Sequence, residues 1–103
     1  MSAPAPAPAP KLAATILLVR DGASGLEVFM VQRHHQIDFA TGALVFPGGK
    51  VDAADYASDE DAYRAAVNAA IRESREEAGL DVSAEQLVYL SHWTTPAGAK
   101  KRF

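Results

Sequence analysis

The chain has 103 residues, 49% of them hydrophobic and 22% charged, which allows one small globular domain with a modest core. Its formal net charge of −3 provides no basic surface for nucleic-acid backbones, and the absence of cysteine excludes disulfides and thiolate metal sites. No apolar run approaches the roughly 20 residues that span a bilayer, and the first residues lack a secretory-signal pattern. We therefore expect a cytoplasmic protein.

The sequence divides into an arm and a domain. Residues 1–11 are rich in alternating alanine and proline, which predicts a disordered, extended arm, and residues 12–103 predict one folded domain. Residues 13–20 (AATILLVR) and 27–32 (EVFMVQ) are β-leaning apolar runs separated by turn residues, so together they predict a hairpin. A third short strand is expected over residues 43–46 (ALVF).

A proline and two glycines follow this third strand directly, at Pro47, Gly48 and Gly49. Proline ends a strand, and glycine permits close approach of other groups to the backbone. By themselves these three residues predict a turn.

Beyond residue 58 the pattern changes to that of a helix. Ser58 and Asp61 resemble a capping box, an alanine-rich run follows them, and Gly79 is placed to end the helix. We expect this helix to pack on the sheet through a face that consists of Val67, Ile71, Ser74 and Ala78. Three glutamates at positions 73, 76 and 77 lie well away from this face.

After the helix, residues 87–93 (LVYLSHW) predict a further strand, and residues 94–98 predict a loop. Tyr89 and Trp93 lie four apart and therefore share one face of such a strand. Core packing is the favoured role for these two rings, with a base-binding pocket as the alternative.

Three carboxylates crowd the end of the predicted helix. Glu73 shares a helix face with both Glu76 and Glu77, and like charges so placed destabilise an isolated helix. Hard divalent cations prefer oxygen ligands, so this cluster is a candidate metal site. A solvated acidic helix end is the alternative for the bare pattern.

The order of residues 72–80 (RESREEAGL), after 46–49 (FPGG), resembles the box of Nudix hydrolases, G-x5-E-x7-R-E-U-x-E-E-x-G-U, in which U is aliphatic. Ser74 stands where an aliphatic residue is expected, and Asp55 stands in place of the first glutamate. Sixteen residues separate Asp55 from Arg72, where the box has seven.

The resemblance implies an α/β (α+β) fold, the Nudix-type α/β/α sandwich with a mixed sheet. The Nudix domain is expected to continue with further strands and a helix, so residues 12–103 resemble the N-terminal portion of a longer enzyme, incomplete at the C-terminus. The general base is then expected beyond Phe103.

A narrower resemblance concerns the branch that hydrolyses coenzyme A and its esters. Residues 42–55 fit its pattern G-x-V-x-F-P-G-G-x-x-D-x-x-D, with Leu44 for the valine. Arg33 fits the first arginine of the signature, whereas Asp38 stands where a second arginine is expected.

The family resemblance also assigns roles to residues. It implies Mg²⁺ or Mn²⁺ as cofactor, with catalytic roles for Arg72, Glu73 and Glu76. Arg72 is expected to pair with Asp55, or with Asp52, and to hold the loop against the helix. The implied metal ligands are Glu73, Glu76, Glu77 and the carbonyl of Gly49. The implied substrate-binding residues are Arg33 and Gly48.

The implied function is metal-dependent hydrolysis of a pyrophosphate bond in a nucleoside diphosphate linked to another group. Coenzyme A or acyl-CoA is the leading substrate, and ADP-ribose or a dinucleotide is the alternative. A different class, an inactive Nudix-fold binding module or fragment, also stays open. The expected partner is a small nucleotide-type molecule, without nucleic acid or membrane, and a homodimer is left open.

Overall fold

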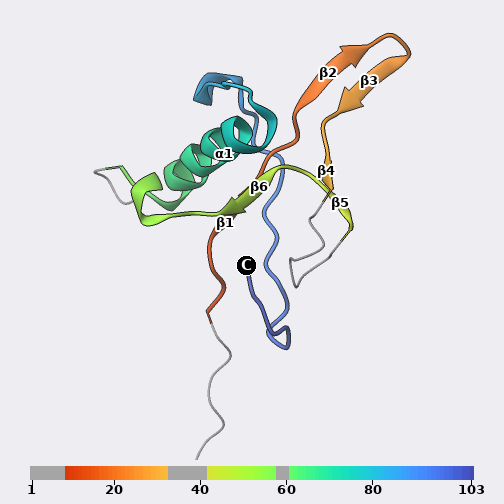
Figure 1. Cartoon of the computed structure of the whole chain (residues 1–103). Helices are drawn as coiled ribbons and strands as arrows, with labels where there is room; N and C mark the ends of the chain where they lie inside the picture. The colour runs from red at the N-terminus through yellow and green to blue at the C-terminus, as the bar shows by residue number, and fades with distance from the viewer. Residues whose placement is uncertain (1–8, 33–41, 58–60) are drawn as a thin grey trace, which may run out of the picture.

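The structure, a computed structural model, describes residues 9–32, 42–57 and 61–103. Arg33, Asp38 and Ser58, which belong to the sequence patterns described above, lie outside the described residues. The elements in chain order (Figure 1) are β1 Ala13–Thr15, β2 Val19–Gly22, β3 Gly25–Val28, β4 Val31–Gln32, β5 Leu44–Val45, β6 Gly48–Lys50, the 3₁₀ turn η1 Ala53–Asp55, the helix α1 Ala62–Ala78, and the 3₁₀ turn η2 Ala84–Gln86.

The strands form three two-stranded antiparallel ladders, β1–β6, β2–β3 and β4–β5. In Figure 1 the helix α1 lies against β1 and β6, while the β2–β3 hairpin projects away from it. The predicted α+β fold class is confirmed, with one helical layer in the described part of the chain. Within that part, no helix is long and apolar enough to cross a bilayer.

The glycines after Pro47 form a strand, so the predicted turn is wrong. In β6 the residues Gly49 and Gly48 pair with Ala14 and Thr15 of β1. A side chain at Gly48 would overlap the backbone of Ala14 and Thr15. The absence of side chains therefore allows these two backbones to approach, and pairing overrides the poor strand propensity of glycine.

The first apolar run, residues 13–20, forms two short strands. Its N-terminal half pairs with β6 and its C-terminal half pairs with β3, because the chain changes partner between Ile16 and Leu18. The backbone N–H of Phe29 donates to the carbonyl of Leu18 at 2.9 Å. A hairpin between the two runs is confirmed, but it joins only Val19–Gly22 to Gly25–Val28, with Gly25 at φ 128° directly after the turn.

The predicted helix and its end at Gly79 are confirmed, but its N-cap is Asp61 and not Ser58, the first residue of the predicted capping box. Asp61 accepts a hydrogen bond from the backbone N–H of Tyr63 at 3.0 Å and caps the N-terminus of α1. Gly79 ends the helix in the left-handed region at φ 68°, and its N–H donates to the carbonyl of Arg75 at 3.0 Å.

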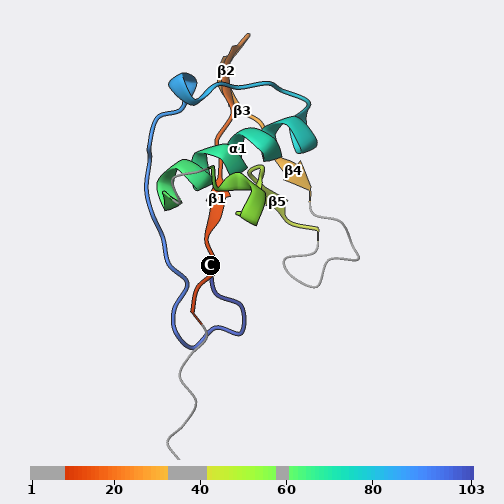
Figure 2. The same ribbon diagram turned by 90° about the vertical axis from the view of Figure 1, so that its left-hand side faces the viewer.

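The packing face of α1 differs from the predicted one. Alanines and one serine are buried, while Val67, Ile71 and Ala78 are only half-buried. Small side chains let the helix approach β1 and β6 closely (Figure 2), whereas the prediction followed the bulkier residues. The helix residues that are buried are Ala65, Ala69, Ala70 and Ser74; of these, Ala69 and Ala70 pack with Ala14 and Ile16 of β1 and its C-terminal extension.

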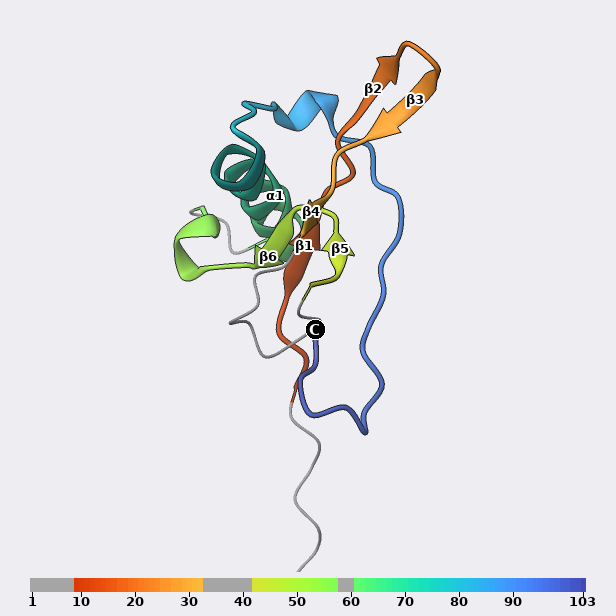
Figure 3. The same ribbon diagram turned by 45° about the vertical axis from the view of Figure 1, so that its right-hand side comes forward.

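The strand predicted over residues 87–93 is absent. Figure 3 shows the chain after η2 as a coil at the periphery, and residues 88–94 form no backbone hydrogen bond with the described residues. Val88 is 90% and Trp93 is 85% exposed, so core packing of Trp93 is wrong. Tyr89 is also exposed, and its ring lies 5.8 Å from that of Tyr63 near the N-terminus of the helix. In the described chain no neighbouring strand offers the backbone groups that a ladder requires.

Candidate metal centre

Arg72 connects the middle of α1 to the loop that follows β6. Its Nε donates to Oδ1 of Asp55 at 3.2 Å and its Nη2 donates to Oδ2 at 3.0 Å, a bidentate pair. Nη2 also donates to the carbonyl of Lys50 at 3.2 Å. The predicted pairing of Arg72 with Asp55 is confirmed, and Asp52 adds a longer contact at 3.4 Å.

Asp55 is fixed from three directions and is only 6% exposed. Besides Arg72, its Oδ2 accepts from the backbone N–H of Asp52 at 2.7 Å, and its carbonyl accepts from Nδ2 of Asn68 at 2.8 Å. The hydrogen bonds from Arg72, opposed by burial, hold the pKa of the Asp55 carboxyl below its ordinary value. No sequence pattern predicted this role for Asn68, although it lies one helical turn before Arg72.

The remaining guanidinium nitrogen of Arg72, Nη1, contacts two glutamates of the helix. Its Nη1 donates to Oε1 of Glu73 at 3.1 Å and to Oε2 of Glu76 at 3.4 Å. The guanidinium therefore bridges Asp55 on the loop and the two glutamates on the helix. These contacts, led by the bond to Asp55, raise the pKa of Arg72, so its charge is permanent.

Glu73 lies on the packing side of the helix, contrary to the prediction that all three glutamates lie away from it. Its side chain is 12% exposed and covers β6, so closely that a Cβ atom at Gly49 would lie 2.5 Å from its Oε1. Burial, followed by the neighbouring Glu77 carboxyl, raises the pKa of Glu73 above its ordinary value. Gly49 is thus a cradle for the Glu73 carboxylate.

The carbonyl of Gly49 retains a free acceptor site. Backbone hydrogen bonds flank this position, from Ile16 N–H to Pro47 O at 2.9 Å and from Val51 N–H to Leu12 O at 3.0 Å. The alternation of an antiparallel ladder then makes Ala14 and Gly49 a hydrogen-bonded pair. One lone pair of the Gly49 carbonyl is left for another ligand.

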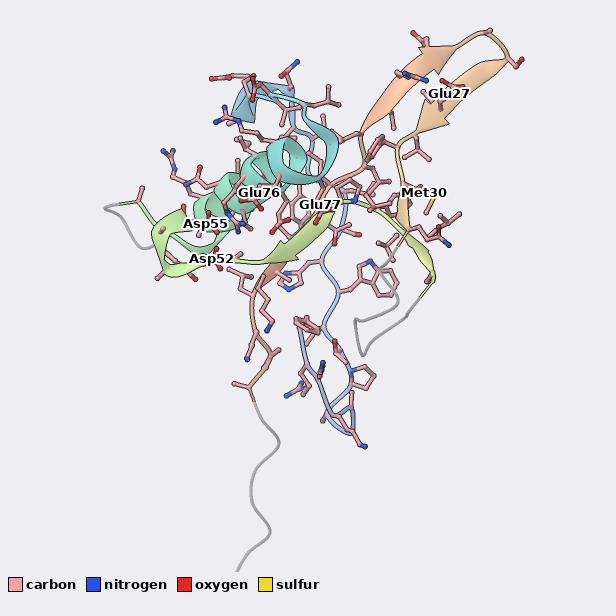
Figure 4. The ribbon with its side chains drawn as sticks, in the orientation of Figure 1. Glu27, Met30, Asp52, Asp55, Glu76 and Glu77 are labelled. Atoms are coloured by element: carbon pink, nitrogen blue, oxygen red, sulfur yellow. The ribbon has the colours of Figure 1, made fainter. Side chains whose placement is uncertain are left out.

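The structure brings most of the predicted site together. Glu73 contacts Gly49 and Glu77, and Arg72 joins Glu73 to Glu76. Figure 4 shows Asp52 and Asp55 on the loop beside α1, and Glu76 and Glu77 on the helix. Gly48 lies next to Gly49 in β6, whereas Arg33 lies outside the described residues.

The donor set fits a hard divalent cation, because it consists of carboxylate oxygens and a backbone carbonyl. Glu76 is 57% exposed and bound to Arg72 only at 3.4 Å, so its side chain has room to turn toward a ligand. Among the described residues, however, no three acidic or histidine side chains already converge on one point. Arg72 occupies the space between Glu73 and Glu76 with a positive charge of its own.

The long spacer between Asp55 and Arg72 does not separate them. Arg72 follows the first residue of α1, Ala62, by ten positions, which is about 15 Å along a helix axis. η1 lies beside the middle of the helix, where Asn68 and Arg72 bind Asp55. The residues from Ala62 onward form the helical turns that precede Arg72, so part of the longer spacer is extra helix and the ion pair is kept.

The ion-paired loop, the glycine strand and the carboxylate helix together define a Nudix-type site. Comparison with known families matches the NUDIX domain over residues 9–103, and the chain belongs to this family.

A crystal structure of a NUDIX hydrolase from Alicyclobacillus acidocaldarius is similar, with 34% sequence identity and a TM-score of 0.57. The similarity covers 67% of this chain but 36% of that protein, so the chain spans about a third of its length. A search of curated proteins found no match.

Proposed function

We propose that this chain carries the metal-binding part of a hydrolase that cleaves a pyrophosphate bond in a nucleoside diphosphate linked to another group. The observation that supports this most strongly is the placement of Glu73 over Gly49, held by Arg72 and the buried Asp55. A purely solvated helix end needs neither a glycine cradle nor a buried counter-ion.

In this proposal Mg²⁺ or Mn²⁺ is held by Glu73, Glu76, Glu77 and the carbonyl of Gly49. A bound cation would neutralise phosphate charge and lower the pKa of a bound water, which is the chemistry that cleavage of a doubly anionic linkage requires. The carboxylate of Glu73 is already oriented toward β6, and the exposed Glu76 completes the set by rotating its side chain.

The residues of the chain also have tasks of their own. Asp55 accepts hydrogen bonds from Nε and Nη2 of Arg72. The guanidinium would therefore stay beside Glu73 and Glu76 even when a bound cation replaces their hydrogen bonds to Nη1. Arg72 and Glu73 thereby act together, the arginine as the support and the glutamate as the ligand. We assign substrate binding to Arg33 and to the backbone at Gly48.

The substrate we propose first is coenzyme A or an acyl-CoA, on the pattern of residues 42–55. ADP-ribose and dinucleotides are the rivals. The setting we propose is cytoplasmic, and the partner is a small molecule rather than a nucleic acid or a membrane.

A panel of these three substrate classes with Mg²⁺ tests the proposal, comparing the parent chain with Glu76→Gln. We expect kcat/KM to fall by about 100-fold, since the amide removes a charged ligand. Glu85→Gln, an exposed glutamate in η2, is the matched control and should keep the parent rate. Equal turnover by the parent and Glu76→Gln would remove Glu76 from the site.

A second candidate is a binding module without turnover. It is favoured by Arg72, whose guanidinium lies between Glu73 and Glu76, so that no three acidic or histidine side chains of the described residues converge on one point. Titration calorimetry with Mg²⁺, combined with the substrate panel, separates the two candidates. Metal binding with no hydrolysis of any substrate in the panel would select the module.

A further inference from the structure

Asn68 holds the same residue that Arg72 holds, one helical turn away. Its Nδ2 donates to the backbone carbonyl of Asp55 at 2.8 Å, while Arg72 binds the side-chain carboxylate of Asp55. The two side chains lie four apart on α1 and therefore on one face. Two different residues of the helix therefore form hydrogen bonds with Asp55, one with its backbone and one with its side chain.

We propose that Asn68 is a positioning residue for the metal-ligand carboxylates. By fixing the backbone of Asp55, it sets the distance at which this carboxylate meets Arg72. The position of Arg72 in turn sets where its Nη1 stands between Glu73 and Glu76. This inference rests on the proposed function only where it concerns metal binding.

The shortness of the aspartate side chain is the physical reason. A single methylene separates the Asp55 carboxylate from its backbone, so the bidentate geometry at 3.0 and 3.2 Å requires η1 to stay close to the helix. Asp52 fixes the carboxylate within the turn but does not attach the turn to α1 by a backbone bond. The bond from Asn68 is the one that attaches the Asp55 backbone directly to the helix among the described contacts.

A merely stabilising role for Asn68 makes a different prediction from a positioning role. If Asn68 keeps the backbone of Asp55 close enough for the carboxylate to reach Arg72, a longer acidic side chain at position 55 should compensate for the loss of Asn68. Glu extends the carboxylate by one methylene. The capping box of η1 accepts Glu at this position, so Asp55→Glu keeps the turn. If Asn68 only stabilises the helix or the turn, the longer acid restores nothing.

The experiment compares the parent with Asn68→Ala, Asp55→Glu and the double variant. The first readout is the NMR resonance of the Arg72 Nε–H, assigned by its loss in Arg72→Lys, which requires neither metal nor activity. The second is the dissociation constant for Mg²⁺ by calorimetry. Asn68→Leu, which keeps bulk and helix propensity, replaces Asn68→Ala if the latter does not fold.

We expect Asn68→Ala to lose the protected Nε–H resonance and to bind Mg²⁺ about tenfold more weakly, as for other residues that orient a ligand. The double variant should recover both. Ala66→Gly, which destabilises the same helix without touching η1, should keep the resonance.

Two results would overturn the inference: an unchanged Nε–H resonance in Asn68→Ala and Asn68→Leu, or a double variant no better than Asn68→Ala. Failure of the parent to bind Mg²⁺ would refute the proposed function instead. In that case the resonance still decides whether Asn68 positions Arg72.

Discussion

Residues 72–79 and residues 88–94 both carry strong sequence patterns, yet they differ in structure. In the first stretch Arg72 bonds to four residues, Ser74 donates to the carbonyl of Ala70 at 2.8 Å, and Gly79 closes the helix. In the second stretch the backbone is unpaired with the described residues, and Val88 and Trp93 are exposed.

The difference shows that a local pattern forms an element only where the chain supplies its partner. A helix satisfies its own backbone hydrogen bonds, and Arg72 needs only one loop to complete its contacts. A strand needs a neighbour for every second N–H and carbonyl, and the described chain offers none beside residues 88–94. The two stretches therefore differ in whether their polar backbone and side-chain groups find partners, and not in how apolar they are.

The largest expected effect comes from breaking the ion pair that orders the first region. Arg72→Ala leaves the carboxylate of Asp55 buried without its counter-ion, which should lower the free energy of unfolding by about 3 kcal/mol. Urea unfolding followed by circular dichroism measures this. Arg72→Lys keeps the charge but loses the bidentate hydrogen bonds, so its stability should fall between that of the parent and that of Arg72→Ala. A variant as stable as the parent would show that the pair contributes nothing to the fold.

The cradle under Glu73 should give the next largest effect. In Gly49→Ala the new Cβ would lie 2.5 Å from Oε1 of Glu73, so this carboxylate must turn away from β6; because it is the end of a flexible side chain, the cost should be about 1 kcal/mol. Gly98→Ala is the matched control, because nothing lies within 4 Å of a Cβ there, and it should leave stability unchanged. Both values come from the same urea titration. Equal stability of the two variants would contradict the close contact.

Acid should weaken the first region through Asp55. Because Arg72 lowers the pKa of this carboxyl in the folded state, its contribution is complete above the unfolded value of about 3.9 and is lost as pH falls through the folded pKa. The free energy of unfolding should therefore fall as the pH drops below about 4.

Asp55→Asn should flatten this pH dependence, since the amide does not titrate. Asp81→Asn, at an exposed ion pair with Arg75, is the control for the loss of one carboxylate. If the free energy of unfolding fell as steeply with decreasing pH in Asp55→Asn as in the parent, the pH dependence would belong to other groups.

The features of the fold that could be predicted from sequence are the local ones. Gly79 ends α1 through a contact within a few residues, as predicted, whereas the predicted capping box began at Ser58 and the N-cap is Asp61. The pairing of Arg72 with Asp55 was also predictable, but only from the family pattern, since sixteen residues separate them.

The features that could not be predicted depend on tertiary pairing. Gly48 and Gly49 have no intrinsic preference for a strand, and β1 imposes it on them. The prediction placed Val67 and Ile71 in the core because they are apolar, whereas the close approach of helix and sheet selects Ala69 and Ala70. Asn68 has no sequence signal of its own, because its partner is a backbone carbonyl.

The smallest expected effect concerns the exposed stretch. Trp93→Ala should change the free energy of unfolding by less than about 0.5 kcal/mol, because this residue is 85% exposed and its Nε1 donates to Oγ of Ser91, itself exposed, at 2.9 Å. In the parent, the emission of Trp93 should already be that of an indole in water and should shift little on unfolding. Ile16→Ala, in the buried core, should lower stability by about 3 kcal/mol under the same conditions. A blue-shifted emission or a large loss in Trp93→Ala would mean that residues 88–94 are covered in solution, and the contrast between the two stretches would then disappear.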